Sequence, residues 1–479
     1  MIEAVTSNFA DVVTRVIDPA AAEVEQHPPR LRADGRVEFH PAHHVAGRAV
    51  WASGIISAGA REQASLLYEL AHAGEAGHAC PVVCTAGLVR ALRAHAGDEL
   101  RERFLPPLLE TNYDRAQRGA QFLTERHGGS DVGANRVEAV PDGDTWRISG
   151  EKWFCSVADA DQFVVTARPQ GAPKGTRGIG CFLVPRSGGG FTIRRLKDKL
   201  GTRALATGEI EFDGAPAYAL GPVEDGFRIA VSILNTSRWL NALGSTGLMR
   251  RAFLEASSFA QEREAFGGPI ARFPLVRENL AVMSSEAAAA LASSMHLTEL
   301  VALIDEGSAT EEDVTWHRIL VNANKFVTSL AATAMCRRGI EALGGNGTIE
   351  DFSPLPRLYR DAIVFESWEG THNVLCAQVL RDLVKFDTVG LVLERVGGEA
   401  PADLEPRLRR SVADPDFGAL YVRRQLDTLV CALQAVGLRA DGREASAELH
   451  ARRHLRPGYD PQDDSDYADL IDGVLREDD

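Results

Sequence analysis

The chain has 479 residues, 45% of them hydrophobic and 25% charged, which is enough for several domains that each bury a core. Asp and Glu outnumber Lys and Arg by 67 to 52, and the net charge of −15 at pH 7 argues against a protein that coats nucleic acid. The sequence also lacks the run of about 18 apolar residues that a membrane span needs. We therefore expect neither nucleic acid nor a membrane as a partner.

The seven cysteines are scattered along the chain, and their number is odd. This pattern indicates a reducing compartment rather than a disulfide framework. The first residues, MIEAVTSNFADVV, show no basic segment followed by an apolar one, so the sequence predicts no signal peptide. We therefore expect the protein to be cytoplasmic.

Residues 1–118 are predicted to form an N-terminal helical domain. Pro28, Pro29 and Pro41 are expected to interrupt any long helix near the start. From about Val45 to Leu109, apolar residues recur three and four positions apart, which is the spacing of one helix face.

Residues 119–222 change to a period of two and predict a central β domain, either a barrel or a sandwich. Pro141–Asp144 is predicted to form a hairpin turn, because Pro presets φ and Gly accepts a positive φ. The segments that predict strands are GAQFLT, NRVEAV, TWRISGEKWF, QFVVTA, GIGCFLVP, FTIRRL and GEIEFD.

Residues 223–386 return to long helical patterns, and residues 387–479 are predicted to be an additional helical region. In that region Pro401–Pro415 is expected to be a linker, and Gly418–Leu455 to be helical. From Asp387 to the end, 20 acidic residues stand against 12 basic ones, a net charge of −8. The last 20 residues are strongly acidic and are predicted to be a solvated tail.

The order of helices, strands and helices differs from the strand–helix alternation of a doubly wound sheet and favours an α+β fold. No G-x-G-x-x-G follows a predicted strand and opens a helix, so the sequence offers no Rossmann dinucleotide site. A flavin or nucleotide would have to be held in another way.

The segment Phe122–Asp131, FLTERHGGSD, follows a predicted strand. Its small residues allow backbone N–H groups to approach a phosphate closely, and Thr124 and Ser130 add hydroxyl donors. An ordinary strand-to-loop transition has the same composition, and the segment alone favours that interpretation.

The segment Trp153–Ser156, WFCS, ends a predicted strand. Its aromatic rings could flank a planar cofactor, and the hydroxyl of Ser156 could bond to a ring nitrogen. A half-buried strand explains the same residues and is the favoured interpretation of the segment by itself.

The segment Glu366–Asn373, ESWEGTHN, is predicted to begin a helix. Gly370 permits a sharp turn, and Glu369 would lie near the helix N-terminus, where unpaired N–H groups point at a ligand. In an apolar cleft this carboxylate could act as a general base. An acid that only stabilises the helix N-terminus is an equally good interpretation.

Signals for a metal site are weak. His40, His43 and His44 lie close together, and His78 precedes two cysteines. Neither group has two separated C-x-x-C pairs or an H-E-x-x-H helix, so packing is the preferred interpretation and no metal is expected. A catalytic serine also lacks support, because no G-x-S-x-G elbow follows a strand.

Taken together and in this order, the segments resemble the acyl-CoA dehydrogenase family over roughly residues 39–383. FLTERHGGSD is similar to the family's TEP-x-x-GSD signature, with Arg126 in the place of Pro. GEKWFCS is similar to its flavin-contacting strand, with Phe154 in the place of Trp and Ser156 in the place of Thr. SRWLNALGSTG resembles the helix that brings an arginine to the substrate, here Arg238.

Three later segments extend the resemblance. QEREAFGGPI is similar to the family's R-x-x-F segment, and EALGGNGT is similar to its Q-x-x-GG-x-G turn, with Glu341 in the place of Gln. SWEGTHN is similar to the segment that carries the catalytic base. Six similarities in family order are far more specific than any one of them.

The resemblance implies an N-terminal helical domain, a central β-barrel domain, a C-terminal four-helix bundle and an extra helical region. It implies FAD as the cofactor and an acyl-CoA or acyl-carrier thioester as the substrate. Glu369 is implied to abstract the α-proton while flavin N5 accepts the β-hydride. The substrate-binding residues that it implies are Ser130, Arg238 and Gly370. The FAD-binding residues that it implies are Gln121, Leu123, Thr124, Gly129, Ser130, Phe154, Cys155, Ser156, Arg263, Phe266, Glu341, Gly344, Gly345, Trp368, Thr371 and Asn373.

The resemblance also implies partners. Arg263, Phe266 and the Glu341–Gly345 turn are implied to reach the flavin of a neighbouring subunit, so a homotetramer is expected. An electron-transfer flavoprotein is the implied electron acceptor.

The closer resemblance is to the alkylation-response, AidB-type branch of the family. Five segments are similar in sequence to that branch: ERHGGSDVGANR, EKWFCSVADAD, RLKDKLGTRA, MRRAF and LPRLYRD. The extra region beyond Leu383 is also similar to it. Members of that branch carry a basic, DNA-contacting C-terminal domain, whereas the net charge of −8 here argues against DNA. An oxygen-using oxidase or N-oxygenase on the same fold is the other alternative, and the presence of Glu369 argues against the N-oxygenase.

Overall fold

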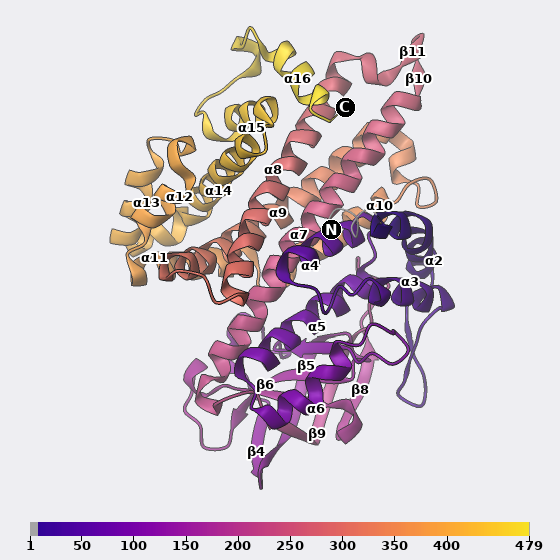
Figure 1. Cartoon of the computed structure of the whole chain (residues 1–479), viewed down its shortest axis with the longest axis vertical. Helices are drawn as coiled ribbons and strands as arrows, with labels where there is room; N and C mark the ends of the chain where they lie inside the picture. The colour runs from indigo at the N-terminus through magenta and orange to yellow at the C-terminus, as the bar shows by residue number, and fades with distance from the viewer. Residues whose placement is uncertain (1–7, 479) are drawn as a thin grey trace. The chain divides into compact units, whose positions relative to one another are not determined.

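A computed structural model describes residues 8–478, and Figure 1 shows the helices and strands. The chain divides into two compact units, Met1–Leu240 and Asn241–Asp479, and the boundary falls inside the long helix α7 (Gly226–Glu262). The described part of the first unit has helices followed by strands, and that of the second is helical apart from one short hairpin.

The helices of the first unit begin where prolines and caps favour a helical start. Pro41 occupies the first turn of α3, where a helix leaves its N–H groups unpaired anyway. Pro41 therefore starts a helix, and no helix runs through Pro28, Pro29 or Pro41, as predicted. The helical elements are η1 (Val13–Ile17), α2 (Asp18–Gln26), α3 (Pro41–Ala52), α4 (Ala60–His72), α5 (Ala76–His95) and α6 (Asp98–Leu108), with a strand pair β1 (Arg30–Leu31) and β2 (Val37–Glu38).

The predicted strands form a closed barrel. β6 pairs with β4, β4 with β5, β5 with β9, β9 with β7, and β7 again with β6. β3 joins β6 in parallel, and β8 joins β9 in antiparallel fashion. Closure pairs the strand edges that an open sheet would expose. The strands are β3 (Gly119–Phe122), β4 (Glu138–Asp142), β5 (Thr145–Ser156), β6 (Gln162–Pro169), β7 (Gly180–Pro185), β8 (Phe191–Leu196) and β9 (Thr207–Ala219).

Two features of β5 follow from its sequence. The hairpin turn predicted at Pro141–Asp144 joins β4 to β5, and Gly143 adopts φ +61° there. Farther along, the register of β5 against β9 shifts between Lys152 and Cys155. Such a shift breaks the strict alternation of inward and outward side chains within the WFCS segment.

The second unit is a helical bundle whose core lies between α7, α8, α9 and α10. Met249, Met283, Met335 and Leu358 come from these four helices and are buried together. This agrees with the predicted bundle. The elements are β10 (Glu264–Ala265), β11 (Gly268–Pro269), α8 (Pro274–Asp305), α9 (Glu311–Leu343), η7 (Gly344–Thr348), α10 (Leu355–Ser367) and α11 (His372–Phe386).

Two stretches of this bundle, Pro274–Asp305 and Glu311–Thr348, are long and apolar enough to cross a membrane by length and composition. Their most apolar windows are 56% and 78% buried inside the protein. Core helices of a bundle have the same length and composition, and their apolar faces are covered here by neighbouring helices.

Further helices, α12 to α16, follow the bundle (Figure 1). α14, α15 and α16 pack against α8, and α12, α13 and α15 pack against α14. Part of the segment Pro401–Pro415, predicted as a linker, is helix α13, and that prediction was wrong. Pro406 lies in the first turn of α13 and Pro415 in the first turn of α14, where proline is tolerated. The helices are α12 (Val389–Val396), α13 (Leu404–Ala413), α14 (Pro415–Ala440), α15 (Glu444–Leu455) and α16 (Tyr467–Arg476).

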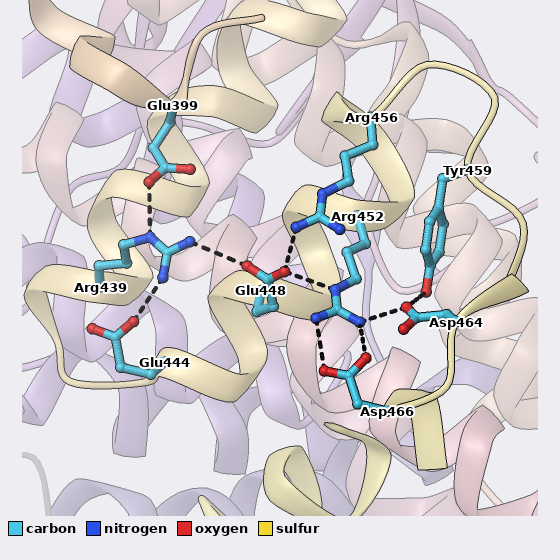
Figure 2. Close-up of polar contacts among 9 residues, drawn as sticks. All are labelled: Glu399, Arg439, Glu444, Glu448, Arg452, Arg456, Tyr459, Asp464 and Asp466. Carbon is cyan, nitrogen blue, oxygen red and sulfur yellow. Dashed lines mark hydrogen bonds and ion pairs between the residues drawn. The ribbon is translucent and has the colours of Figure 1, made fainter. Parts of the chain in front are cut away.

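The acidic tail is folded, so the prediction of a solvated tail was also wrong. Helix α16 buries Ile471 and Val474 against α8 and α15. Its acids find basic partners: Asp472 binds Arg277 of α8. Figure 2 shows Arg452 of α15 surrounded by Glu448, Asp464 and Asp466. An excess of acid in the sequence did not reveal that these carboxylates pair with arginines elsewhere in the same unit.

Candidate active site

The loop that follows β3 carries the first group of candidate residues. Gln121 donates from Nε2 to Oγ of Ser237 at 2.8 Å, while its Oε1 is buried without a hydrogen bond to the described residues. A Cβ added to Gly129 would lie 2.4 Å from Oγ1 of Thr124, so only glycine fits at this approach. Ser130 is exposed at the turn.

A buried lysine joins this loop to the neighbouring strand β5. Lys152 is fully buried, and its Nζ donates to the carbonyl of Leu123 at 3.0 Å, to Oε1 of Glu125 at 3.0 Å and to Oγ1 of Thr166 at 3.2 Å. Burial lowers the pKa of Lys152 to about 8, and Glu125 opposes that shift. Lys152 thus holds the FLTERHGGSD loop against the GEKWFCS strand.

Sequence reasoning did not single out Lys152. A signal was present, because Lys152 follows Ile148 and Gly150 at alternate positions of a predicted strand, and Ile148 is a core position. A lysine at an inward position of a barrel strand requires a buried acceptor or counter-ion.

The WFCS segment presents an aromatic ring to solvent. The side chain of Phe154 is 55% exposed, which is unusual for so large an apolar group. Nζ of Lys197 lies 3.5 Å from the ring centre of Trp153 and 4.8 Å from that of Phe154. Cys155 points into the core, and burial raises the pKa of its thiol. The hydroxyl of Ser156 lies 3.3 Å from Oγ1 of Thr207.

Arg238 lies on the part of α7 that belongs to the first unit. Its side chain is mostly buried, and its guanidinium donates to Oδ1 of Asn235 at 3.0 Å. The guanidinium of Arg90 lies 5.0 Å from the ring centre of the next residue, Trp239. These contacts fix this stretch of helix in the first unit.

The second unit holds Glu369 in a loop between two helices. The segment Glu366–Asn373 does begin a helix, as predicted, but only at His372, where α11 starts; Glu366 belongs to the last turn of α10. Glu369 adopts φ +55° and Gly370 φ +110°. A positive φ is uncommon for a residue with a side chain, and such strain persists only where the surroundings impose it.

Two side chains impose this conformation. Nδ2 of Asn241 donates to Oε2 of Glu369 at 3.2 Å and to the carbonyl of Phe365 at 3.3 Å. Lys325 is fully buried on α9, and its Nζ donates to the carbonyls of Glu366 at 2.9 Å and Gly370 at 3.4 Å. Sequence reasoning found neither residue, because both act across long separations in the chain.

Other side chains of this segment are also anchored. Glu366 accepts from Oγ1 of Thr333 at 2.5 Å and lies 3.0 Å from Nε2 of His372. The ring of Trp368 stacks on Phe365 with ring centres 4.8 Å apart. Oδ1 of Asn373 accepts from Arg423 at 3.2 Å.

The remaining candidates lie at the other end of the bundle. The hairpin β10–β11 exposes Arg263 and 93% of the Phe266 side chain, which also has φ +50°. The part of α7 between Asn241, which contacts Glu369, and this hairpin is roughly 30 Å long at 1.5 Å per residue. Within one chain, Phe266 and Glu369 therefore lie at opposite ends of the bundle.

The turn after α9 lies at the same end as the hairpin. Glu341 is exposed and pairs with Arg337 at 3.5 Å, while Gly344 has φ +62°. Just beyond this turn, Phe352 packs edge-on against Phe259 near the end of α7, with ring centres 6.1 Å apart. Arg263, Phe266 and the Glu341–Gly345 turn are therefore exposed at the same end of the bundle.

These residues fit a flavin nucleotide. Such a cofactor needs polar, close-packed and aromatic contacts. Oε1 of Gln121 is a buried acceptor without a hydrogen bond to the described residues, Gly129 allows the backbone to come close, and the ring of Phe154 is exposed. The histidines near the N-terminus instead pack together, since the rings of His43 and His78 are buried 4.0 Å apart.

Comparison with known proteins identifies the class. Residues 120–215 match the acyl-CoA dehydrogenase middle domain, and residues 224–384 match the acyl-CoA dehydrogenase C-terminal domain. Residues 16–115 match the adaptive response protein AidB N-terminal domain. The AidB protein of Escherichia coli is 34% identical over 384 residues, which are 74% of this chain and 69% of that protein.

Solved structures agree. The Caenorhabditis elegans acyl-CoA dehydrogenase ACDH-11, in complex with C11-CoA, superposes with a TM-score of 0.86 at 26% identity, covering 96% of this chain and 88% of that one. A Bacillus anthracis acyl-CoA dehydrogenase complexed with FAD shares the fold, with a TM-score of 0.78 at 20% identity over 99% of this chain and 87% of that one.

The chain belongs to the acyl-CoA dehydrogenase family of oxidoreductases, for which FAD is the typical cofactor. Its N-terminal domain and its likeness to AidB make it a member of the AidB type. The predicted fold is confirmed: an N-terminal helical region, a central β-barrel and a C-terminal helical domain with extra helices.

Proposed function

We propose that the protein is an FAD-dependent dehydrogenase that oxidises the Cα–Cβ bond of an acyl-CoA or acyl-carrier thioester. The observation that carries the proposal is the conformation of the loop at Glu369. The backbone of Glu369 has a positive φ, and contacts from α7 and α9 hold the loop and the carboxylate in place. When bound, FAD supplies the two-electron acceptor, taking the β-hydride at N5. The product is the α,β-unsaturated thioester.

Glu369 is the proposed base. One carboxylate oxygen accepts the hydrogen bond from Asn241, which leaves the carboxylate oriented to take the α-proton. The backbone N–H of Glu369 is proposed to donate to the thioester oxygen, where negative charge develops as the proton leaves. Lys325 fixes the carbonyls on both sides of Glu369 and so sets the direction of that N–H group.

The FAD site is proposed to combine residues from more than one chain. Gln121, Thr124, Gly129 and the WFCS strand belong to one unit of a protomer. Arg263, Phe266 and the Glu341–Gly345 turn lie a bundle's length away from the Glu369 loop of the same chain. We infer a homo-oligomer, with a tetramer expected, in which this exposed group serves a neighbouring protomer. Light scattering that finds a monomer with tightly bound FAD would contradict it.

The solved complex of ACDH-11 with C11-CoA supports an acyl-CoA as the substrate. An electron-transfer flavoprotein is the proposed electron acceptor. The chain length of the acyl group is open to a direct experiment: anaerobic bleaching of the flavin against a series of acyl-CoAs identifies the class by the fastest reaction.

The charge of the extra helices favours a dehydrogenase over a DNA-associated protein. Figure 2 shows three arginines that are each paired with carboxylates of the same unit: Arg439 of α14, Arg452 of α15, and Arg456 just after α15. Guanidinium groups that are already neutralised release few counterions on binding a phosphate backbone. We expect no retention on DNA even at ~50 mM salt, where electrostatic binding is strong.

The substitution Glu369→Gln tests the proposed base. Gln keeps the size of the side chain and its acceptor for Asn241 but takes no proton. Flavin reduction by the preferred acyl-CoA should fall at least ~10²-fold, while FAD and the acyl-CoA stay bound.

Glu366→Gln is the matched control, three residues away. Gln can still bond to Thr333 and His372, so flavin reduction should change by less than ~10-fold. If Glu366→Gln abolished reduction and Glu369→Gln did not, the assignment of the base would be wrong.

A further inference from the structure

A group of metal-ligand side chains lies between the bundle and the extra helices, away from the proposed base. Glu286 of α8 faces His450 and His454 of α15. Nε2 of His454 lies 2.6 Å from Oε1 of Glu286, and Nδ1 of His450 lies 3.5 Å from Oε2. One ligand atom from each of the three residues lies within 4.8 Å of the others.

The two histidines are presented by one helix face. They are four residues apart on α15, so their side chains point the same way. The helix is held in register against α8 by Oγ of Ser285, which donates to the carbonyl of Ser446 at 2.9 Å, one turn before His450. The geometry of the group is therefore set by the packing of two helices rather than by a loop.

The group contains a buried imidazole that is held only by long contacts. His450 is 1% exposed, and its partners are the carboxylate of Glu286, 3.5 Å from Nδ1, and the backbone of Cys431. His454 is partly open to solvent, so a small ion has a path to the group. A buried imidazole held by such long contacts would be better satisfied by a ligand on its lone pair.

We propose that Glu286, His450 and His454 form a binding site for a divalent transition-metal ion, with Zn²⁺ as the best match to two imidazoles and a carboxylate. His₂–carboxylate sets are common zinc ligands, and a fourth position can be taken by water from the open side. A bound ion joins α15 to α8 across residues 168 positions apart in the chain.

The surrounding charges are compatible with a cation. The guanidinium of Arg453 lies 3.7 Å from Oε1 of Glu286 and repels a bound cation. The carboxylate of Asp427, which interacts electrostatically with Glu286 and both histidines, attracts it. With Glu286 and Asp427 ionised, two negative charges offset the ion, and Arg453 leaves one net positive charge at the edge of the site.

Two other groups of histidine and glutamate bring their ligand atoms equally close together but draw their histidines from separate elements. The rings of His27 and His40 stack within 20° of parallel near Glu23, and those of His43 and His78 within 31° near Glu75. His450 and His454 instead lie one turn apart on a single helix, α15, with their ring centres 4.6 Å apart.

Zinc binding by the tag-free, full-length protein tests the site. After treatment with a chelator and dialysis against Zn²⁺, metal analysis should find one ion per chain. Absorption at the zinc K-edge should show nitrogen and oxygen ligands only, although Cys431 lies nearby. His454→Ala and Glu286→Gln should each weaken binding by at least ~100-fold, since even outer-shell partners are worth 10–100-fold.

His27→Ala is the control, because it removes a histidine of the exposed group near Glu23. This variant should still bind one ion. Wild-type protein that takes up no zinc would overturn the proposal and leave an ion pair between Glu286 and His454. Equal binding by the wild type and His454→Ala would place the ion elsewhere and would overturn it too. Circular dichroism of each variant separates loss of the site from loss of the fold.

Discussion

The barrel and the bundle each bury one lysine beside a candidate functional loop, and the two lysines work differently. Lys152 in the barrel binds a carboxylate, Glu125, as well as a carbonyl of the loop after β3. Lys325 in the bundle binds the carbonyls on either side of Glu369. Both ammonium groups are removed from water, and both are used to fix backbone that no helix or strand would hold.

The difference lies in what each lysine supports. Glu125 also accepts from the N–H groups of Arg136 and Val137, at 2.6 and 3.1 Å, so Lys152 is part of a network that organises a stretch of the barrel. Lys325 donates to the carbonyl of Glu366, in the last turn of α10, and to that of Gly370, in the connection to α11. We infer that the barrel lysine matters mainly for stability and cofactor retention, and that the bundle lysine matters mainly for the position of the base.

The largest effect is expected for Lys152→Met, which keeps the length of the side chain and removes the charge. It leaves Glu125 buried without its counter-ion, and breaking a buried ion pair in this way costs about 3–5 kcal/mol. Urea unfolding should show this loss, together with weaker retention of FAD.

The double variant Lys152→Met/Glu125→Gln is the control. With no buried charge remaining, it should recover part of the stability that Lys152→Met loses. A double variant that is less stable than Lys152→Met would show that Glu125 stabilises the loop without Lys152.

A smaller loss of stability is expected for Lys325→Met, about 1–3 kcal/mol for carbonyls that lose their donor. Its effect on activity should be larger than that of Lys152→Met: flavin reduction should fall by ~10²-fold as the Glu369 loop shifts, while FAD content stays unchanged. Stopped-flow reduction and the flavin spectrum measure the two separately. Full activity in stable Lys325→Met protein would remove the proposed role of Lys325.

Asn241→Leu sharpens the comparison further, because it removes the amide donor to the Glu369 carboxylate and leaves Lys325 in place. Reduction should fall by ~10-fold, the value of one hydrogen bond to a charged group. Ser245→Ala is the control, since Ser245 lies 3.5 Å from Oδ1 of Asn241, on the side of the amide away from its bond to Glu369. It should change the rate by less than ~2-fold.

The barrel strands were predictable because alternation is a local property that seven segments show independently. The loop at Glu369 was harder. The sequence ESWEG contains a turn former, but it does not show that Glu369 rather than Gly370 begins the positive-φ stretch. Tertiary contacts decide that, and Lys325 reaches carbonyls 41 and 45 residues away.

Charge was the least reliable signal. The acidic C-terminal residues look solvated when they are counted alone, because a count does not include partners elsewhere. Asp472 pairs with Arg277, 195 residues earlier in the chain. Nothing in the local sequence indicates such a pair, and only the amphipathic spacing of Ile471 and Val474 hinted that the tail packs.

The smallest effect is expected at a third lysine, Lys197, whose side chain is 10% exposed and whose carboxylate partner also binds an exposed arginine. Glu209 of β9 holds Lys197 at 2.7 Å, above the ring of Trp153, and it also binds Arg195 at 2.7 Å. The hydrogen bond from Arg195, with help from Lys197, lowers the pKa of Glu209 to about 2 from its ordinary 4.5. Arg195 is 62% exposed, so water screens the pair and keeps its contribution to stability small.

Because the pKa of Glu209 is lower in the folded protein, its ionised form stabilises the fold at pH values above about 4.5, and this contribution disappears as the pH falls through about 2. Glu209→Gln should therefore be less stable than the wild type by about 1 kcal/mol at pH 7 and equally stable near pH 2. Urea unfolding of both proteins across this range measures the difference. A difference that persists at pH 2 would mean that the glutamine amide disturbs packing, and that the charge of Glu209 is not the source of the effect.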